Sequence, residues 1–168
     1  MEILIFSDSH GRAEAMETAL ARQIKRPDCV FFLGDGLRDV QAVEWGNSPL
    51  YTVRGNCDWF FFEDAPQERL VTLGGHRFFA THGHAYGVKS GTGALLSHAA
   101  HAGADVILFG HTHNPLCEIL PVGTEVGGIR LTRPMYLFNP GSIGDTSHSF
   151  GTLSLMGDQL LFSHGNID

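Results

Sequence analysis

Apolar runs alternate with segments of helical periodicity in the first third of the chain. Three runs end in polar residues, as expected for short strands buried on both faces. The expected strands are residues 3–6, 29–35 and 50–56, and the expected helices between them are residues 13–24 and about 37–44. This strand–helix–strand–helix–strand order predicts a parallel sheet with right-handed crossovers.

The rest of the chain is richer in strand-like runs. Residues 68–83 predict two strands joined by a turn at Gly74 and Gly75. A helix over about 91–102 and a strand over 104–110 follow. The later expected strands are residues 116–120, 129–137, 151–155 and 159–163, with "MGDQ" as a hairpin turn. No linker or repeat interrupts the pattern, so one domain over residues 1–168 is expected, with two sheets face to face and helices outside.

Residue types that bind metals follow five of these apolar runs. The five segments are "FSDSHG" with Asp8 and His10, "FLGDG" with Asp35, "VRGNCD" with Asn56, "FATHGH" with His82 and His84, and "LFGHTH" with His111 and His113. Ligands bind beyond the carboxyl ends of parallel strands, where these segments would meet. In an extended segment, side chains two residues apart point the same way. A single Asp here would be read as a helix cap or a turn residue, but recurrence at five strand ends predicts a metal centre.

The ordered motifs D-x-H, G-D, G-N-C, G-H and G-H-x-H resemble those of the calcineurin-like metallophosphoesterase superfamily. The "GNCD" segment, the short chain and "NPGS" at residues 139–142 are similar to the small YfcE-type phosphodiesterase branch. The resemblance implies an α/β fold, a four-layer αββα sandwich of two mixed β-sheets flanked by helices. It also implies two metal ions: Asp8, His10, Asp35 and His113 would hold one, and Asp35, Asn56, His82 and His111 the other, with Asp35 bridging.

Oxygen and nitrogen ligands of this kind suit two divalent ions, with Mn²⁺ expected first and Fe, Ni or Zn as alternatives. Two ions bring a charge of about +4 and the two carboxylates remove about 2, so the site would attract a phosphate ester. Metal binding lowers the pKa of water from about 15.7 to roughly 7, which gives a bridging hydroxide for in-line attack. No Ser or Cys nucleophile is then needed. The expected activity is a metal-dependent phosphodiesterase with a small phosphate-ester substrate.

The segment "RGNCDW" at residues 54–59 departs from many relatives, in which a His follows the Asn and is thought to protonate the leaving group. A thiol with a pKa of about 8.5 matches that role poorly. Esters with good leaving groups, such as aryl phosphodiesters, are therefore expected. The candidate catalytic residues are Asn56, Cys57 and His84, with Asp58 as another candidate proton donor. Structural roles are equal alternatives for His84 and Asp58.

Several further residues carry expectations. The segment at residues 139–142 is expected to support the site, but the Pro-Arg that follows it in many relatives is absent. Arg38 is either a replacement for that Arg or a surface residue. The aromatic run Trp59 to Phe62 is core, a substrate wall or a homo-oligomer interface. Cys29 and Cys117 are expected to be buried.

Composition excludes several classes of protein. The chain has 168 residues, 43% of them hydrophobic, which is enough for a sizeable core. A formal net charge of -7 argues against a long nucleic-acid partner. No apolar run reaches the ~18–20 residues that span a bilayer, and the start of the chain lacks the basic region of a signal peptide. Three cysteines without CxxC spacing fit a reducing cytoplasm.

Two alternatives to a phosphodiesterase remain open. A phosphomonoesterase or pyrophosphatase for a small metabolite would use the same ligands, so the ligand residues do not separate these activities. A non-catalytic scaffold is the other alternative, because the retromer small subunit resembles this fold with an impaired metal site. All seven ligand positions are filled in this chain, which favours an enzyme.

Overall fold

The computed structural model describes residues 1–58, 64–145 and 147–168. The first sheet has the strand order β12 (Gln159–Asn166), β11 (Ser149–Met156), β1 (Glu2–Phe6), β2 (Cys29–Phe32), β3 (Leu50–Thr52). The second has the order β4 (Glu68–Leu73), β5 (His76–Thr81), β6 (Val106–Leu108), β10 (Met135–Asn139), β7 (Leu116–Leu120). A separate ribbon pairs β8 (Glu125–Val126) with β9 (Ile129–Arg130). The helices are α1 (Ala13–Ala21), α2 (Leu37–Ala42) and α3 (Gly93–His101), and η1 (His84–Tyr86) is a 3-10 turn.

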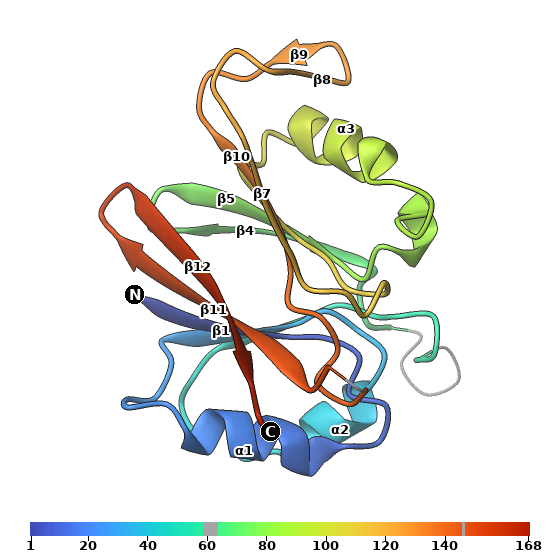
Figure 1. Cartoon of the computed structure of the whole chain (residues 1–168), viewed down its shortest axis with the longest axis vertical. Helices are drawn as coiled ribbons and strands as arrows, with labels where there is room; N and C mark the ends of the chain where they lie inside the picture. Colours follow the sequence, from blue (N-terminus) through green and yellow to red (C-terminus); the bar gives the residue numbers. More distant parts are fainter. Residues whose placement is uncertain (59–63, 146) are drawn as a thin grey trace.

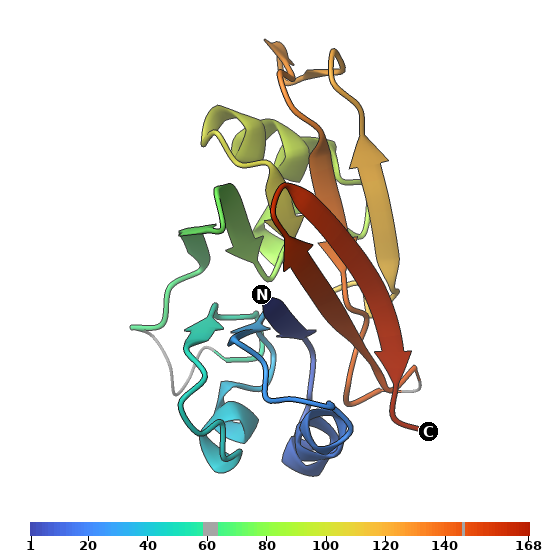
Figure 2. The ribbon, with the colours of Figure 1, turned by 90° about the vertical axis from the view of Figure 1, so that its left-hand side faces the viewer.

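The two large sheets pack face to face, with α1 and α2 outside the first and α3 outside the second (Figures 1 and 2). Strand alternation explains these layers, because successive side chains of a strand point to opposite faces. In β1, Ile3 and Ile5 pack in the core between the sheets, whereas Leu4 and Phe6 pack against the helices. The predicted four-layer αββα sandwich is therefore confirmed.

The second sheet repeats the same alternation. Phe78 and Phe138 enter the core between the sheets, and Phe79 and Leu137 pack under α3 with Leu95. Burying apolar surface on both faces explains why central strands such as β1, β2 and β6 read as continuous apolar runs.

Both sheets are mixed, and their parallel strands lead into the loops that carry the predicted metal ligands. In the first sheet β1, β2 and β3 are parallel, with β11 antiparallel to β1. In the second, β5, β6 and β10 are parallel, with β4 and β7 antiparallel at the two edges. The parallel sheet expected from the first three strands of the chain is confirmed.

Element boundaries differ from the sequence expectations in several places. All three helices are shorter than predicted, and α2 ends because Val43 takes an extended conformation. The strand expected over 129–137 splits into β9 and β10. Pro134 stands directly before β10, and proline has no backbone N–H to donate to a strand ladder. The turn at Gly74 and Gly75 is confirmed, with positive φ at both residues.

One cysteine expectation is wrong. Cys29 is buried in β2 as predicted, but Cys117 is exposed because β7 is the edge strand of its sheet. The predicted interface at Trp59 to Phe62 lies outside the described residues. Within the described ranges, no helix is both long enough and apolar enough to cross a membrane.

Close packing between the sheets predicts the effect of a methyl group at Gly151. A Cβ there would lie 2.4 Å from Cε1 of the buried Phe138 ring on the opposite sheet. We expect Gly151→Ala to lower the free energy of unfolding by about 1–3 kcal/mol, measured by urea denaturation. Gly93→Ala is the control, because a Cβ at the start of α3 meets nothing within 4 Å. Equal stability of the two variants would contradict tight packing at this point.

Candidate metal centre

Five loops that follow parallel strands meet at one place. Asp8 and His10 follow β1, Asp35 follows β2, Asn56 follows β3, His82 and His84 follow β5, and His111 and His113 follow β6. The structure thus brings together all seven predicted metal ligands, which are contributed by both sheets. The side chains form two groups of possible ligand atoms.

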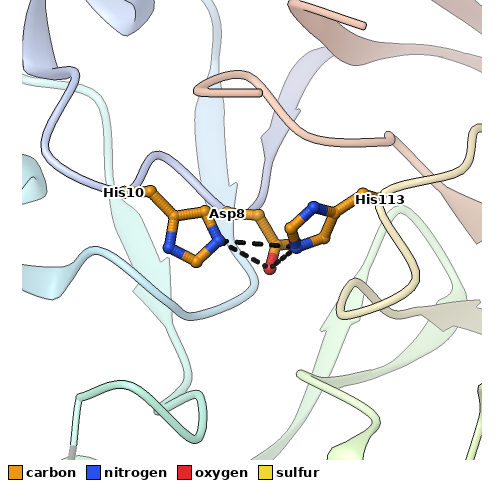
Figure 3. A group of neighbouring side chains, drawn as sticks. All are labelled: Asp8, His10 and His113. Carbon is orange, nitrogen blue, oxygen red and sulfur yellow. Dashed lines mark hydrogen bonds and ion pairs between the residues drawn. The ribbon is translucent and has the colours of Figure 1, made fainter. Parts of the chain in front are cut away.

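The first group contains Asp8, His10 and His113 (Figure 3). The Nε2 atoms of His10 and His113 lie 3.7 and 3.1 Å from Oδ1 of Asp8. The two Nε2 atoms are 3.4 Å apart. Three donor atoms from two loops therefore converge on one point.

The second group surrounds Nε2 of His82. This atom lies 3.3 Å from Oδ2 of Asp35, 3.1 Å from Oδ1 of Asn56 and 3.2 Å from Nδ1 of His111. It also lies 3.9 Å from Oδ1 of Asp8, so the two groups adjoin. A further grouping places ligand atoms of His10, Asp35 and Cys57 within 4.8 Å of one another. This grouping puts Asp35 beside both sets of ligands.

The two carboxylates are oriented as metal ligands would be. Oδ2 of Asp8 accepts hydrogen bonds from the Ser7 hydroxyl and the His111 amide, at 2.5 and 3.1 Å. Oδ1 of Asp8 is buried and has no hydrogen-bond partner among the described residues. Oδ1 of Asp35 accepts from the Cys57 amide at 2.7 Å, while Oδ2 faces His82. A buried carboxylate oxygen without a donor fits a cation at this point.

Two histidines are oriented by hydrogen bonds on their outer nitrogen. Nδ1 of His82 donates to the Leu33 carbonyl oxygen at 2.7 Å, and Nδ1 of His113 donates to Asp145 at 2.8 Å. A proton on Nδ1 leaves the Nε2 lone pair of the neutral imidazole directed into the site, as in metal-ligating histidines. Asp145 was missed by the sequence analysis. Its only signal was an acidic residue shortly after the "NPGS" segment.

The backbone conformation at the ligands corrects one expectation. Asp8, His10, His111 and His113 were expected to face the site in pairs because their segments would be extended. Instead all four have positive φ, between 45° and 66°, as does Asp35 at 60°. Left-handed backbone is uncommon for residues other than glycine and clusters at functional sites. The pairs do converge, but through turns rather than through strand alternation.

Two glycines allow the loops after β2 and β3 to touch. A Cβ at Gly34 would lie 2.6 Å from the Gly55 nitrogen, and a Cβ at Gly55 would lie 2.0 Å from Oδ1 of Asp35. Larger residues would push the two loops apart. The Gly before Asn56 therefore does more than supply a turn, because it lets the Asp35 carboxylate sit against the backbone.

The charges in the centre act strongly on one another. Burial alone would raise the pKa of Asp35, but hydrogen bonding and charge from His82 outweigh burial and hold this pKa well below its usual range. The Asp8 carboxylate, 3.1 Å from Nε2, raises the pKa of His113 to about 9, against the effect of burial. Burial, the charge on His82 and the charge on Lys89 lower the pKa of His111 to about 4. An imidazole binds metal only after losing its proton, so protons and cations compete for His82 and His113.

The candidate catalytic residues lie beside the ligands. The Nδ2 group of Asn56 donates to the Cys57 sulfur at 3.4 Å, which leaves Oδ1 of Asn56 toward His82. Cys57 is exposed as a residue, yet desolvation of its sulfur and the neighbouring Asp35 raise its pKa to about 11. The ring of His84 packs 5.4 Å from that of His82 and 6.1 Å from that of His111. Burial lowers the pKa of His84.

A family model for the calcineurin-like phosphoesterase superfamily domain matches residues 1–159. The chain belongs to this superfamily. It is 34% identical to the probable metallophosphoesterase YsnB of Bacillus subtilis over 85% of this chain and 75% of that protein. It is 31% identical to the phosphodiesterase YfcE of Escherichia coli over 91% of this chain and 87% of that protein. The expected placement in the small YfcE-type branch is confirmed.

The fold is shared more widely than the sequence. A structure of Vps29 from Entamoeba histolytica superposes with a TM-score of 0.75 at 22% identity, over 98% of this chain and 91% of that chain. At this identity the similarity concerns the fold alone.

In this phosphoesterase the "NPGS" segment supports the ligand loops, as expected. The Asn139 amide donates to the Gly110 carbonyl oxygen at 2.9 Å and to the Thr112 hydroxyl at 3.1 Å, just before and after His111. The Ser142 hydroxyl donates to the Asp8 carbonyl oxygen at 2.8 Å. Two ligand-bearing loops, those after β1 and β6, are thereby linked to the end of β10.

Asp58 holds two loops together rather than standing free as a proton donor. Its buried carboxylate accepts four backbone N–H groups at 2.8–3.0 Å, from Asp35, Gly36, Leu37 and Gly55. Arg38 is exposed and lines a cavity of about 240 Å³ that also borders His10, Asp35 and Cys57. It therefore lies beside the centre.

The four hydrogen bonds to Asp58 predict a large effect of Asp58→Asn. The amide would turn an NH₂ group toward backbone donors, so we expect a loss of about 3 kcal/mol in unfolding free energy. Urea denaturation of the metal-free protein measures this, and metal analysis should show weaker retention of ions. Asp64→Asn, at an exposed acidic residue, is the control. Unchanged stability of Asp58→Asn would show that these bonds do not anchor the loops.

Proposed function

We propose that the protein is a binuclear metal-dependent phosphodiesterase that acts on a small phosphate ester with a good leaving group. The observation that carries the proposal is the convergence of seven oxygen and nitrogen donors in two adjoining groups. One buried carboxylate oxygen in these groups lacks any described donor. The family membership and the name of YfcE support a phosphoester hydrolase.

Asp8, His10, Asp35 and His113 would hold one ion, and Asp35, Asn56, His82 and His111 the other. The donors are hard or borderline, which suits Mn²⁺ first and Fe, Ni or Zn as alternatives. Two divalent ions would polarise the phosphoryl oxygens and lower the pKa of a bound water to roughly 7. The residues of the chain orient this chemistry: Leu33 and Asp145 fix two imidazoles, and Cys57 holds the Asn56 amide.

The preference for good leaving groups rests on Cys57. At the position where many relatives have a histidine, this chain has a thiol whose pKa is raised to about 11. Such a thiol keeps its proton at neutral pH and transfers it poorly in a transition state. His84 is the other candidate proton carrier, and burial lowers its pKa. An aryl oxide can leave without being protonated, whereas an alkoxide leaving group needs a proton.

Two alternatives use the same architecture. A phosphomonoesterase or pyrophosphatase would need the same ligands. A scaffold without turnover is suggested by the similarity to Vps29. Our expectation of a reducing cytoplasm rests on the three cysteines without CxxC spacing.

A substrate screen with a ligand variant tests the function. With Mn²⁺, the wild type should hydrolyse bis(4-nitrophenyl) phosphate faster than 4-nitrophenyl phosphate, and chelator should abolish both rates. Asp35→Ala should lower kcat/KM by more than about 100-fold and lose both ions in metal analysis, because Asp35 contributes to both groups. Two tightly bound ions in this variant would refute the bridging role. Absence of metal-dependent turnover on every ester would favour the scaffold.

Replacing the thiol tests the assignment of the missing proton donor. Cys57→His should raise kcat on nucleotide diesters, whose leaving group is an alkoxide, by at least about tenfold. The reason is that general acid catalysis contributes a rate factor of roughly 10²–10⁴. The rate on aryl diesters should change little. Cys117→His, at the other exposed cysteine, is the control. The idea fails if Cys57→His gains no activity on any nucleotide ester.

A further inference from the structure

Two cavities of opposite electrostatic character lie beside the metal centre. The acidic cavity, of about 240 Å³, is bordered by Asp35, Asp39, Asp58, Arg38 and Cys57 among others. The Lys89 cavity, of about 440 Å³, is bordered by four polar residues, Lys89, Thr92, Thr112 and Asn114, and otherwise by apolar side chains. The second volume is within the range typical of small-molecule sites.

The Lys89 cavity is lined in part by a loop that also carries candidate metal ligands. Thr112 and Asn114 alternate along the chain with His111 and His113, so the loop that supplies two ligands also forms a wall of the cavity. Lys89 lies three residues beyond η1, the turn that begins at His84. The cavity and the candidate ligands therefore share one loop.

The charge of the Lys89 cavity is unusual for this protein. The chain has a net charge of -7 and only two lysines, Lys25 and Lys89. No carboxylate is among the residues that border the cavity. Within the described part of the chain, the Lys89 ammonium makes no hydrogen bond or ion pair. A solvent-exposed cation without an acidic partner, beside a phosphate-binding centre, is suited to an anion.

The remaining walls define what carries this anion. Pro115 and Leu116 supply accessible apolar surface, whereas Val88 and Phe109 border the cavity but are almost fully buried. An aromatic or aliphatic group can pack there while its charged end reaches Lys89. The amino end of α3 opens onto the same space at Thr92, and its dipole has the same sign as Lys89. The acidic cavity has three carboxylates beside its cation Arg38, so the Lys89 cavity is the more suitable place for this anion.

We propose that the Lys89 cavity is a substrate subsite that binds a second anionic group, carried on one ester arm of the phosphodiester. This inference rests on the proposed function, because it assigns an arm of the same substrate. The scissile phosphate lies at the candidate metal ligands, the charged arm lies against Pro115 and Leu116 toward Lys89, and the other arm lies toward Cys57. Lys89 is then a residue that determines specificity.

A matched pair of substrates tests the subsite. The pair is 4-nitrophenyl phenyl phosphate and its analogue with a carboxylate at the 4-position of the phenyl ring. We expect the wild type to show a lower KM for the carboxylate analogue. Lys89→Met should raise that KM about fivefold, the upper range for an exposed ion pair, with little change in kcat. Lys89→Arg should retain the preference, and added salt should weaken it.

Controls separate this proposal from the function on which it rests. Lys25→Met removes the other lysine and should leave both KM values unchanged. The subsite is wrong, although the function stands, if wild type cleaves both esters with equal KM or if Lys89→Met changes both KM values equally. Failure of wild type to cleave either ester with Mn²⁺ would refute the proposed function.

Binding without turnover gives a second measurement. Benzylphosphonate and 4-carboxybenzylphosphonate resist hydrolysis, so calorimetry can compare their affinities directly. The carboxylate form should bind wild type and Lys89→Arg more tightly, and Lys89→Met should bind the two alike. A carboxylate preference that persists in Lys89→Met would place the anion elsewhere and overturn the assignment.

Discussion

Two buried carboxylates, Asp8 and Asp35, impose the constraint on which the rest of the site depends. Neither residue is more than 3% exposed, and a buried charge without partners costs about 3–5 kcal/mol. The loops supply donors to one oxygen of each carboxylate, from Ser7 and His111 to Asp8 and from Cys57 to Asp35. The other oxygen of each faces imidazoles. Ligand loops, glycine contacts and left-handed backbone all follow from placing these two charges side by side.

The spacing of the donors depends on how the two sheets pack. Each ligand group draws on both sheets: the first combines the loop after β1 with the loop after β6, and the second combines the loops after β2 and β3 with those after β5 and β6. Contacts such as the stacked rings of Phe31 and Phe78, with centroids 5.7 Å apart, set the distance between the sheets. Any ion held by either group would tie the sheets together, and its binding energy would add to the stability of the fold.

Local pattern was enough to locate most strands and to place the candidate ligands at their ends, because an apolar run followed by a polar residue marks the end of a buried strand. It was not enough for features set by distant contacts. Positive φ at Asp8 is held by tertiary hydrogen bonds, including that of its own amide to the Gly34 carbonyl oxygen at 2.9 Å. Asp145 meets His113 across 32 residues of chain. Cys117 is exposed only because its strand lies at an edge, which depends on strand order rather than on composition.

The net charge of the chain is a poor guide to what the centre binds, because the nearest acidic groups already have partners. Asp39 accepts from the Ser9 hydroxyl and the Gly11 amide, and Asp58 accepts four backbone amides. These carboxylates stabilise loops, and oriented N–H dipoles offset their charge locally. The atoms that face the centre are oxygen and nitrogen atoms with lone pairs, which favour cations. Lys89 borders the cavity next to them. An acidic protein can therefore present a cationic site, because position and hydrogen bonding, rather than the sum of charges, determine the local potential.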